Sequence, residues 1–436
     1  MNKSPLALFG GKPVLKNPFS IISSIGKEER NAVKSVMCTG VISDFIGRAG
    51  EKFFGGKEVK KFESAICKIF KIKYAVSFNS ASTALNSSLI ALGIGPGDEV
   101  ITTPFTMSAT ATAILQNNAI PIFADIDPET FCIDPRSIEK KITKKTKAII
   151  AVNIFGNSAD YKKIIPLAKK HNLKIIEDNA QSIGAKYNDK YLGTIGDIGV
   201  FSFNANKALQ CGEGGVLVTN NKRIAFRAQL ARNHGEAVID DMDKVVQQED
   251  ISGNNFRLTE LHAVIALEQL KKMNSINKRK IELANYLTKK ILNYSWIIPC
   301  VVQSDRVHVY FTYPLKFLND VAGISRSTFE RAMFAEGFPL NKGYVKPIYL
   351  MSIYQRRKIY KNSLFPFVSK EFNTNISYKK GICPVAEVMF EKELLLSPIC
   401  SCARSKRDID LFVSAINKID KYMPCLIQYE KSLKRV

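Results

Sequence analysis

The sequence lacks the features that mark a membrane protein, a disulfide-rich secreted protein or a zinc protein. Its first residues contain no apolar run of signal-peptide length, and longer apolar stretches such as Ala148–Val152 are far too short to cross a bilayer. The nine cysteines form no CxxC pair beside histidines, of which there are only four. These absences predict a cytoplasmic protein with reduced thiols, no metal site and no insertion into a membrane.

Acidic residues are scarce relative to basic ones. The chain has 63 Lys and Arg against 40 Asp and Glu, a formal net charge of +23. The lysines are locally enriched at 140–147, 271–280 and 342–361, but no helix-turn-helix signature or aromatic stacking pattern accompanies them. The excess therefore predicts solvated helix faces, with attraction of an anionic substrate as the second interpretation. Nucleic-acid binding would need a basic stripe on one face, and the even spread gives no indication of one.

Short β-branched runs alternate with amphipathic stretches, a pattern typical of βαβ units and a mostly parallel sheet. The composition, 46% hydrophobic and 24% charged, is that of an ordinary globular protein with room for two domains. The predicted strands are Tyr74–Phe78, Glu99–Thr102, Ile120–Phe123, Ala148–Val152, Lys174–Glu177, Val200–Phe203 and Gly215–Thr219. The predicted helices between them are Thr83–Leu92, Ala109–Asn117, Pro135–Lys141 and Tyr161–His171.

A long amphipathic helix is expected over Glu260–Leu292, followed by a smaller α+β region. We therefore expect a large α/β domain over residues 1–275, with an N-terminal arm, and a smaller C-terminal domain over residues 276–436.

Polar residues that directly follow strands are the first candidates for a site, because ligands of parallel sheets lie beyond the carboxyl ends of the strands. Ser80, Ala81 and Ser82 lead from a strand into a helix. Their small side chains allow backbone N–H groups to approach a phosphate, and the hydroxyls add donors. An ordinary helix N-cap is the alternative interpretation of the same residues.

Asp178 follows the apolar run Leu173–Ile176, at the expected end of a buried strand. A buried carboxylate needs a partner, and a pyridinium nitrogen would supply one while Asp178 keeps that nitrogen protonated. A cap of the following helix is the alternative.

Lys207 closes the segment FSFNANK and precedes the glycine-rich segment CGEGG and another strand. In a tight, partly desolvated turn a lysine loses its proton more easily and can act as a Schiff-base amine. A surface lysine would be the ordinary interpretation of such a residue alone. A phosphate cradle, a pyridinium acceptor and an imine-forming amine, in this order and each at a strand end, together favour a pyridoxal phosphate (PLP) site.

The segments ALGIGPGDEVITTPFT, FADIDPETFCIDP, KIIEDNAQSIGAKY, GTIGDIGVFSFNANK, CGEGGVLVTN, RNHGE and GNNFRLTELHAVIALEQL resemble the DegT/DnrJ/EryC1/StrS aminotransferases. The resemblance is strong over residues 5–300 and looser beyond. It implies the PLP-dependent transferase fold of the aspartate aminotransferase type, fold type I. It also implies a homodimer with active sites shared between the subunits.

The resemblance assigns roles to individual residues. Lys207 would carry pyridoxal 5'-phosphate, Asp178 would pair with the pyridine nitrogen, and Gln181 would reach the 3-oxygen of the cofactor. Asn255 would enter the site of the partner subunit and complete its phosphate contacts. The remaining cofactor contacts would come from Ala81, Ser82 and Ser202 at the phosphate and from Met107 over the ring, where many relatives have an aromatic residue.

The implied reaction moves an amino group from glutamate or glutamine to a keto sugar, most simply a nucleotide-linked hexose, in amino-sugar or polysaccharide biosynthesis. The opening LALFGGKPV resembles cyclitol and aminobenzoate-forming relatives and keeps an acceptor without a nucleotide open. A PLP-dependent sugar dehydratase is disfavoured because such relatives have His where this chain has Lys207. A nucleic-acid-binding regulator and a dehydrogenase remain the weakest alternatives, the latter because no GxGxxG follows the early strands.

Overall fold

The computed structural model describes residues 5–17, 19, 23–241 and 250–433. Its central element is a seven-stranded sheet of order β1-β9-β8-β5-β4-β2-β3, in which β9 alone runs against the others. The predicted mostly parallel α/β sheet is thereby confirmed. The strands are β1 Tyr74–Phe78, β2 Glu99–Thr102, β3 Ile120–Phe123, β4 Thr146–Val152, β5 Lys174–Asp178, β8 Ile198–Ser202 and β9 Gly215–Thr219.

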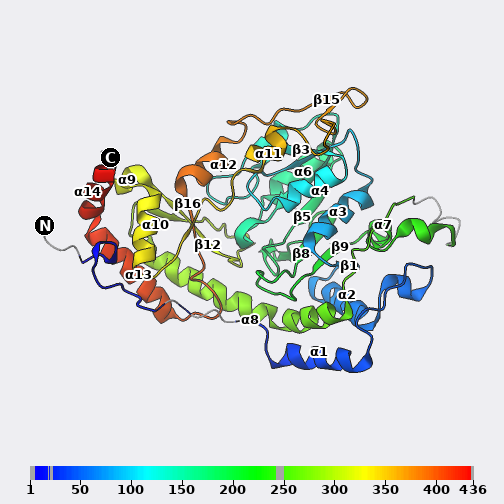
Figure 1. The fold of residues 1–436 in the computed structure, drawn as a ribbon, viewed down its shortest axis with the longest axis horizontal. Helices are drawn as coiled ribbons and strands as arrows, with labels where there is room; N and C mark the ends of the chain where they lie inside the picture. Colours follow the sequence, from blue (N-terminus) through cyan, green and yellow to red (C-terminus); the bar gives the residue numbers. More distant parts are fainter. Residues whose placement is uncertain (1–4, 18, 20–22, 242–249, 434–436) are drawn as a thin grey trace.

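Helices cover both faces of this sheet (Figure 1). One face packs on α3 Ala81–Leu92, α4 Ala109–Gln116 and α7 Lys222–Arg232. The other face packs on α2 Lys57–Phe70, on α5 Pro135–Glu139 with α6 Tyr161–Lys170, and on the first half of α8 Glu260–Ile291. Helix α1 Lys27–Thr39 lies against α8. Because both faces are covered, the parallel strands are apolar almost throughout, as their sequences predicted.

Strand β8 begins two residues before its predicted start, and the reason is a glycine. Gly199 interrupts the apolar run in the sequence, yet it pairs with Glu177 of β5 inside the sheet. A Cβ on Gly199 would lie 2.2 Å from the carbonyl oxygen of Gly193, so the close passage of the chain at Gly193 requires a residue without a side chain.

The second half of the chain builds a four-stranded sheet of order β10-β12-β16-β13. Its strands are β10 Ile297–Pro299, β12 Tyr313–Phe317, β16 Leu394–Ser397 and β13 Asn341–Lys342. It packs in a second core with the end of α8, with α10 Arg326–Ala335 and with α13 Lys406–Lys421. The remaining elements are short or terminal: β6 Lys186–Tyr187, β7 Lys190–Tyr191, β11 Arg306–Val307, α9 Asn319–Ala322, α11 Ser352–Gln355, β14 Val368–Ser369, β15 Thr374–Asn375, α12 Pro384–Val388 and α14 Met423–Leu433.

Helix α8 connects the two cores without a break (Figure 1). The proposed domain boundary at residue 275 falls inside this helix. The segment that contains Tyr349, Tyr354 and Tyr378 returns to the core of the large sheet, where all three rings contact Phe123 of the edge strand β3. Within the described residues, no helix combines the length and the apolar character needed to span a bilayer.

Candidate active site

The three predicted strand ends meet at one edge of the large sheet. Asp178 is the last residue of β5 and Ser202 the last residue of β8. Across the neighbouring strands, Ser202 pairs with Gly215, and Gly215 pairs with Phe78 of β1. Because α3 begins directly after β1, its first turn and the ends of β5 and β8 lie along the same carboxyl edge of the sheet.

The first turn of α3 forms a small, open anion cradle. Ser80 caps the helix by accepting a hydrogen bond from the N–H of Thr83 at 3.2 Å. The strand β9 passes so closely that a Cβ on Gly215 would lie 2.4 Å from the nitrogen of Ala81. Ala81 is half-buried and Ser82 exposed, so the start of the helix is open to a ligand. An N–H-rich helix start flanked by the Ser202 hydroxyl suits a phosphate group.

Asp178 is a buried carboxylate, 4% exposed, held in place from two sides. Its Oδ2 accepts a hydrogen bond from the Thr110 hydroxyl at 2.8 Å, and its Oδ1 accepts one from the N–H of Ala180 at 3.1 Å. Burial raises the pKa of Asp178, while these two donors and the nearby charge of Lys207 lower it. A fixed buried carboxylate whose oxygens each accept one of these hydrogen bonds keeps acceptor capacity for a pyridinium nitrogen.

Lys207 lies in the predicted tight turn between β8 and β9. Its N–H donates to the carbonyl of Asn204 at 2.9 Å, and Gly212 closes the turn with φ +88°, a conformation that a residue with a side chain rarely adopts. Burial lowers the pKa of the Lys207 amine, and the carboxylate of Asp178 opposes this shift in part. The Nζ lies 4.8 Å from the centre of the Phe311 ring. A desolvated amine near a carboxylate is suited to imine chemistry.

Gln181 follows one turn after Asp178, and its side-chain amide is fixed at both ends. Its Oε1 accepts a hydrogen bond from the N–H of Phe155 at 2.9 Å, and its Nε2 donates to the Tyr344 hydroxyl at 2.7 Å. One Nε2 hydrogen therefore remains for a ligand oxygen.

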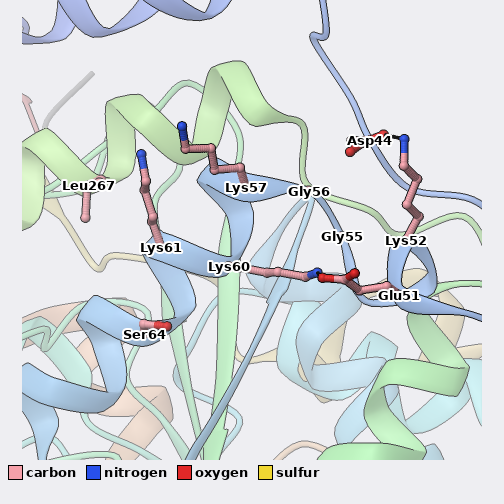
Figure 2. A pocket seen from close by; sticks show the side chains of 10 residues that line it. All are labelled: Asp44, Glu51, Lys52, Gly55, Gly56, Lys57, Lys60, Lys61, Ser64 and Leu267. Atoms are coloured by element: carbon pink, nitrogen blue, oxygen red, sulfur yellow. Dashed lines mark hydrogen bonds and ion pairs between the residues drawn. The ribbon is translucent and has the colours of Figure 1, made fainter.

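A cavity of about 1060 Å³ opens beside Lys207. It lies between the turn that carries Lys207, helix α8 and the second sheet, and Tyr344 and Phe311 contribute to its walls. Its volume is in the range of pockets that enclose small molecules. A further hollow of about 760 Å³ lies at the start of α2, away from Lys207; Figure 2 shows that its lysines come mainly from this helix and that Lys52 and Lys60 are paired with Asp44 and Glu51.

Two of the predicted site residues, Met107 and Asn255, are exposed on the surface of the chain. Met107 is 59% exposed, so its predicted contact with the cofactor ring stays a prediction. Asn255 is exposed, and its Oδ1 accepts a hydrogen bond from Nε of Arg257 at 2.7 Å. Its neighbour Phe256 accepts a backbone hydrogen bond from Asn79 at 2.9 Å, which places this segment beside the phosphate cradle of its own chain. The role of Asn255 in a partner subunit stays a prediction.

The sequence reasoning missed Thr110, Tyr344, Phe311 and Lys280. Thr110 lies in the first turn of α4, the helix after β2, and could have been found by inspecting that strand end as well. The other three come from α8 and the second half of the chain, where no local pattern marks a residue that folds back onto the large sheet.

The arrangement fits PLP on the observations above. A buried, doubly hydrogen-bonded carboxylate, an amine whose pKa is lowered by burial, and a helix start that only glycine at 215 can approach correspond to the pyridine nitrogen, the aldehyde and the phosphate of that cofactor. Asp178, Lys207 and the Ser80–Ser82 turn with Ser202 would hold these three groups.

Comparison with known proteins gives the same result. The spore coat polysaccharide biosynthesis protein SpsC of Bacillus subtilis is 32% identical over 365 residues, which span 83% of this chain and 91% of that protein. The GDP-perosamine synthase of Escherichia coli O157:H7 is 41% identical over 236 residues, 54% of this chain and 64% of that enzyme. Among solved structures, Helicobacter pylori PseC, an aminotransferase involved in the biosynthesis of pseudoaminic acid, is 25% identical with a TM-score of 0.75, covering 93% of this chain and 100% of that one.

The pattern shared by the DegT/DnrJ/EryC1/StrS aminotransferase family matches residues 45–379. The predicted fold type is confirmed by the solved relatives. With its fold, its candidate site and this match taken together, the chain belongs to the DegT/DnrJ/EryC1/StrS family and is a PLP-dependent aminotransferase.

Proposed function

We propose that this aminotransferase moves an amino group from glutamate or glutamine to a keto sugar, in the biosynthesis of an amino sugar or a polysaccharide. The observation that carries the proposal is that Lys207 and Asp178 lie at one sheet edge, with Lys207 in the wall of a cavity of about 1060 Å³. The relatives named for spore coat polysaccharide, GDP-perosamine and pseudoaminic acid support a sugar as the acceptor.

When bound, PLP supplies an electron sink that makes the Cα–H bond of the donor acidic. The amine of Lys207 would move this proton between Cα of the donor and C4′ of the cofactor. It is suited to act as the base because burial lowers its pKa. Asp178 would hold the ring nitrogen protonated, and Gln181 would donate its second Nε2 hydrogen while the bond to Tyr344 orients the amide.

We infer further that the enzyme works in the cytoplasm as a homodimer in which Asn255 completes the phosphate site of the partner. Support comes from apolar side chains that a single chain leaves exposed. They gather at the end of α1 and in the loop that follows: Met37, Val41, Ile42 and Ile46. Such a surface would be covered by a second copy.

A two-stage incubation tests the proposed reaction. The holoenzyme is first converted with glutamate and freed of excess donor by desalting, and it is then offered a panel of nucleotide-linked keto hexoses and keto cyclitols. We expect an amine at the former keto carbon of a nucleotide-linked sugar, detected by mass spectrometry. Deoxygenation without amine transfer would instead identify a dehydratase, and amination of the cyclitols alone would contradict the nucleotide-sugar acceptor.

A further inference from the structure

The cavity beside Lys207 carries more positive charge than its walls neutralise. The described residues that line it include three lysines, Lys207, Lys280 and Lys342, and no Asp or Glu. Lys342 has a counter-charge just outside the cavity, Glu330 at 3.1 Å. Lys207 has the carboxylate of Asp178 nearby as a counter-charge. Lys280 is therefore the cation of this cavity that still needs a partner.

Lys280 lies on α8 and is only 6% exposed. Within the described part of the chain, its one hydrogen bond runs to the carbonyl oxygen of Phe311 at 3.4 Å, and no ion pair reaches its Nζ. The lysines of the hollow at α2 differ, since Lys52 and Lys60 are exposed enough to be hydrated and are paired with carboxylates (Figure 2). A buried ammonium without a counter-charge costs free energy, so a ligand that supplies the charge would be bound favourably.

The groups around Lys280 do not supply this charge. Burial lowers the pKa of His308 to about 3, with the charge of Lys280 adding to the effect, so that its imidazole is neutral. The Nε2 of His308 is buried without a hydrogen-bond partner. Burial raises the pKa of the Cys400 thiol, and the thiol of Cys402 is the other nearby group. Burial also lowers the pKa of Lys280 to about 8, which leaves the amine mostly protonated at neutral pH.

We propose that Lys280 is an oxyanion-binding residue of this cavity and contacts either the carboxylate of the amino donor or a phosphate of the acceptor. The inference rests on the proposed function for the identity of these substrates, but the binding of an oxyanion is independent of turnover. Both substrates must place their reacting atoms at Lys207, in the same cavity, so both bring an oxyanion within its walls.

Calorimetric titration of the holoenzyme with glutarate and with inorganic phosphate tests this inference. We compare the wild type with Lys280→Met, which removes the charge and keeps an unbranched side chain. Lys278→Met, two residues earlier on the exposed side of the same helix, is the matched control. We expect the dissociation constant of at least one probe to rise about tenfold or more in Lys280→Met and to stay within twofold in the control.

The two probes distinguish the sources of the oxyanion. Weaker binding of glutarate alone assigns Lys280 to the donor carboxylate, weaker binding of phosphate alone assigns it to the acceptor, and weaker binding of both assigns one shared subsite. If Lys280→Met does not fold, as judged by circular dichroism, Lys280→Gln replaces it in the same titrations. Unchanged affinity in the variant, or no binding of either probe to the wild type, overturns the proposal. Failure of the proposed function would appear separately, as holoenzyme that binds the probes but aminates no keto sugar.

Discussion

The amide of Gln181 and the hydroxyl of Tyr344 form a hydrogen bond of 2.7 Å between residues 163 positions apart in the sequence. Gln181 follows strand β5 of the large sheet, whereas Tyr344 follows β13 of the small one. Tyr344 is held with φ +56°, and its ring packs edge-on against Phe105 and Phe155. The small sheet thus fixes the orientation of an amide in the proposed cofactor site.

Tyr344→Phe is expected to keep the ring packing and to lose the orientation of Gln181. One hydrogen bond of this kind contributes about 0.5–1.5 kcal/mol, so we expect the dissociation constant of PLP to rise roughly two- to tenfold. Equilibrium dialysis measures the change. Tyr360→Phe, which removes the bond from an exposed tyrosine hydroxyl to Asn118, is the control. Equal cofactor affinity in the two variants would show that Tyr344 does not act through Gln181.

Lys207→Ala is expected to abolish the covalent attachment of PLP, because Lys207 is the amine beside Asp178 whose pKa burial lowers. The purified wild type should be yellow and lose its absorbance band with borohydride, and the variant should show no such band. Lys342→Ala, which alters another lysine of the same cavity, should retain it. A borohydride adduct mapped by mass spectrometry to any other lysine contradicts the assignment.

Asp178→Asn is expected to bind PLP and yet lose at least about a thousandfold in transamination, or about 4 kcal/mol, because an amide cannot keep the ring nitrogen protonated. Stopped-flow measurement of the half-reaction with glutamate gives the rate. Thr110→Val, which removes the 2.8 Å hydrogen bond to this carboxylate and a longer contact with the Thr106 hydroxyl, should lose much less. Near-normal turnover in Asp178→Asn would reduce Asp178 to the cap of the following turn.

Subunit mixing tests the shared site. Lys207→Ala and Asn255→Asp subunits are each inactive under our proposal. If Asn255 completes the site of the other subunit, a mixed dimer has both substitutions in one site, and its second site combines an intact Lys207 with an intact Asn255. Random exchange should then restore roughly a quarter of wild-type activity, assuming equal mixing and twofold pairing. Verified exchange with no recovered activity would mean that Asn255 acts on the phosphate cradle of its own chain, beside which its segment lies.

Lys280→Met is expected to stabilise the protein at neutral pH. Because burial depresses the pKa of Lys280 to about 8, the unfolded chain binds more protons than the folded one between pH 8 and the ordinary lysine pKa of 10.5. The penalty is therefore full below pH 8 and disappears as the pH rises toward 10.5. It amounts to about 3 kcal/mol at most. The groups beside Lys280 are His308, which is neutral in this range, and the thiols of Cys400 and Cys402, so no carboxylate among them compensates its charge.

Urea unfolding at pH 7.0 and 9.5 measures this difference. The advantage of Lys280→Met over the wild type should shrink by more than half between the two values. A constant difference would mean that packing rather than charge distinguishes the variants, and a variant less stable than the wild type at pH 7.0 would contradict the buried, unpaired ammonium.

The sheet and most of the candidate site could be predicted from the sequence because their signals are local. Each buried strand is a short apolar run, and the site residues lie at or soon after strand ends: Ser80 after β1, Asp178 at the end of β5 and Lys207 in the turn after β8. Parallel strands bring such positions together whatever the rest of the chain does. The predicted start of β8 is two residues too late. In the sequence Gly199 interrupts an apolar run, whereas in the structure it lies inside the strand and allows the close passage of Gly193.

Tyr344 and Lys280 could not be predicted in the same way. Their place in the candidate site depends on how the second half of the chain packs on the first. Neither the residue types nor their spacing in the sequence predicts that packing. Lys280 has the sequence context of an ordinary lysine on a basic helix, between Arg279 and Ile281. Only its burial, without a carboxylate partner, separates it from Lys278 on the same helix.

The return of the late segment to the first core also restricts how this enzyme can be recombined with its relatives. The hydroxyl of Tyr378 donates a hydrogen bond to the carbonyl of Pro121 in β3 at 2.8 Å, and the rings of Tyr349 and Tyr354 pack on the adjoining Phe123. A chimera joined at residue 275 would take these aromatic side chains from one parent and the edge strand from the other. A graft intended to exchange acceptor preference should instead keep residues 344–390 with the parent that supplies β3, and replace only the cavity wall that follows it, residues 396–403.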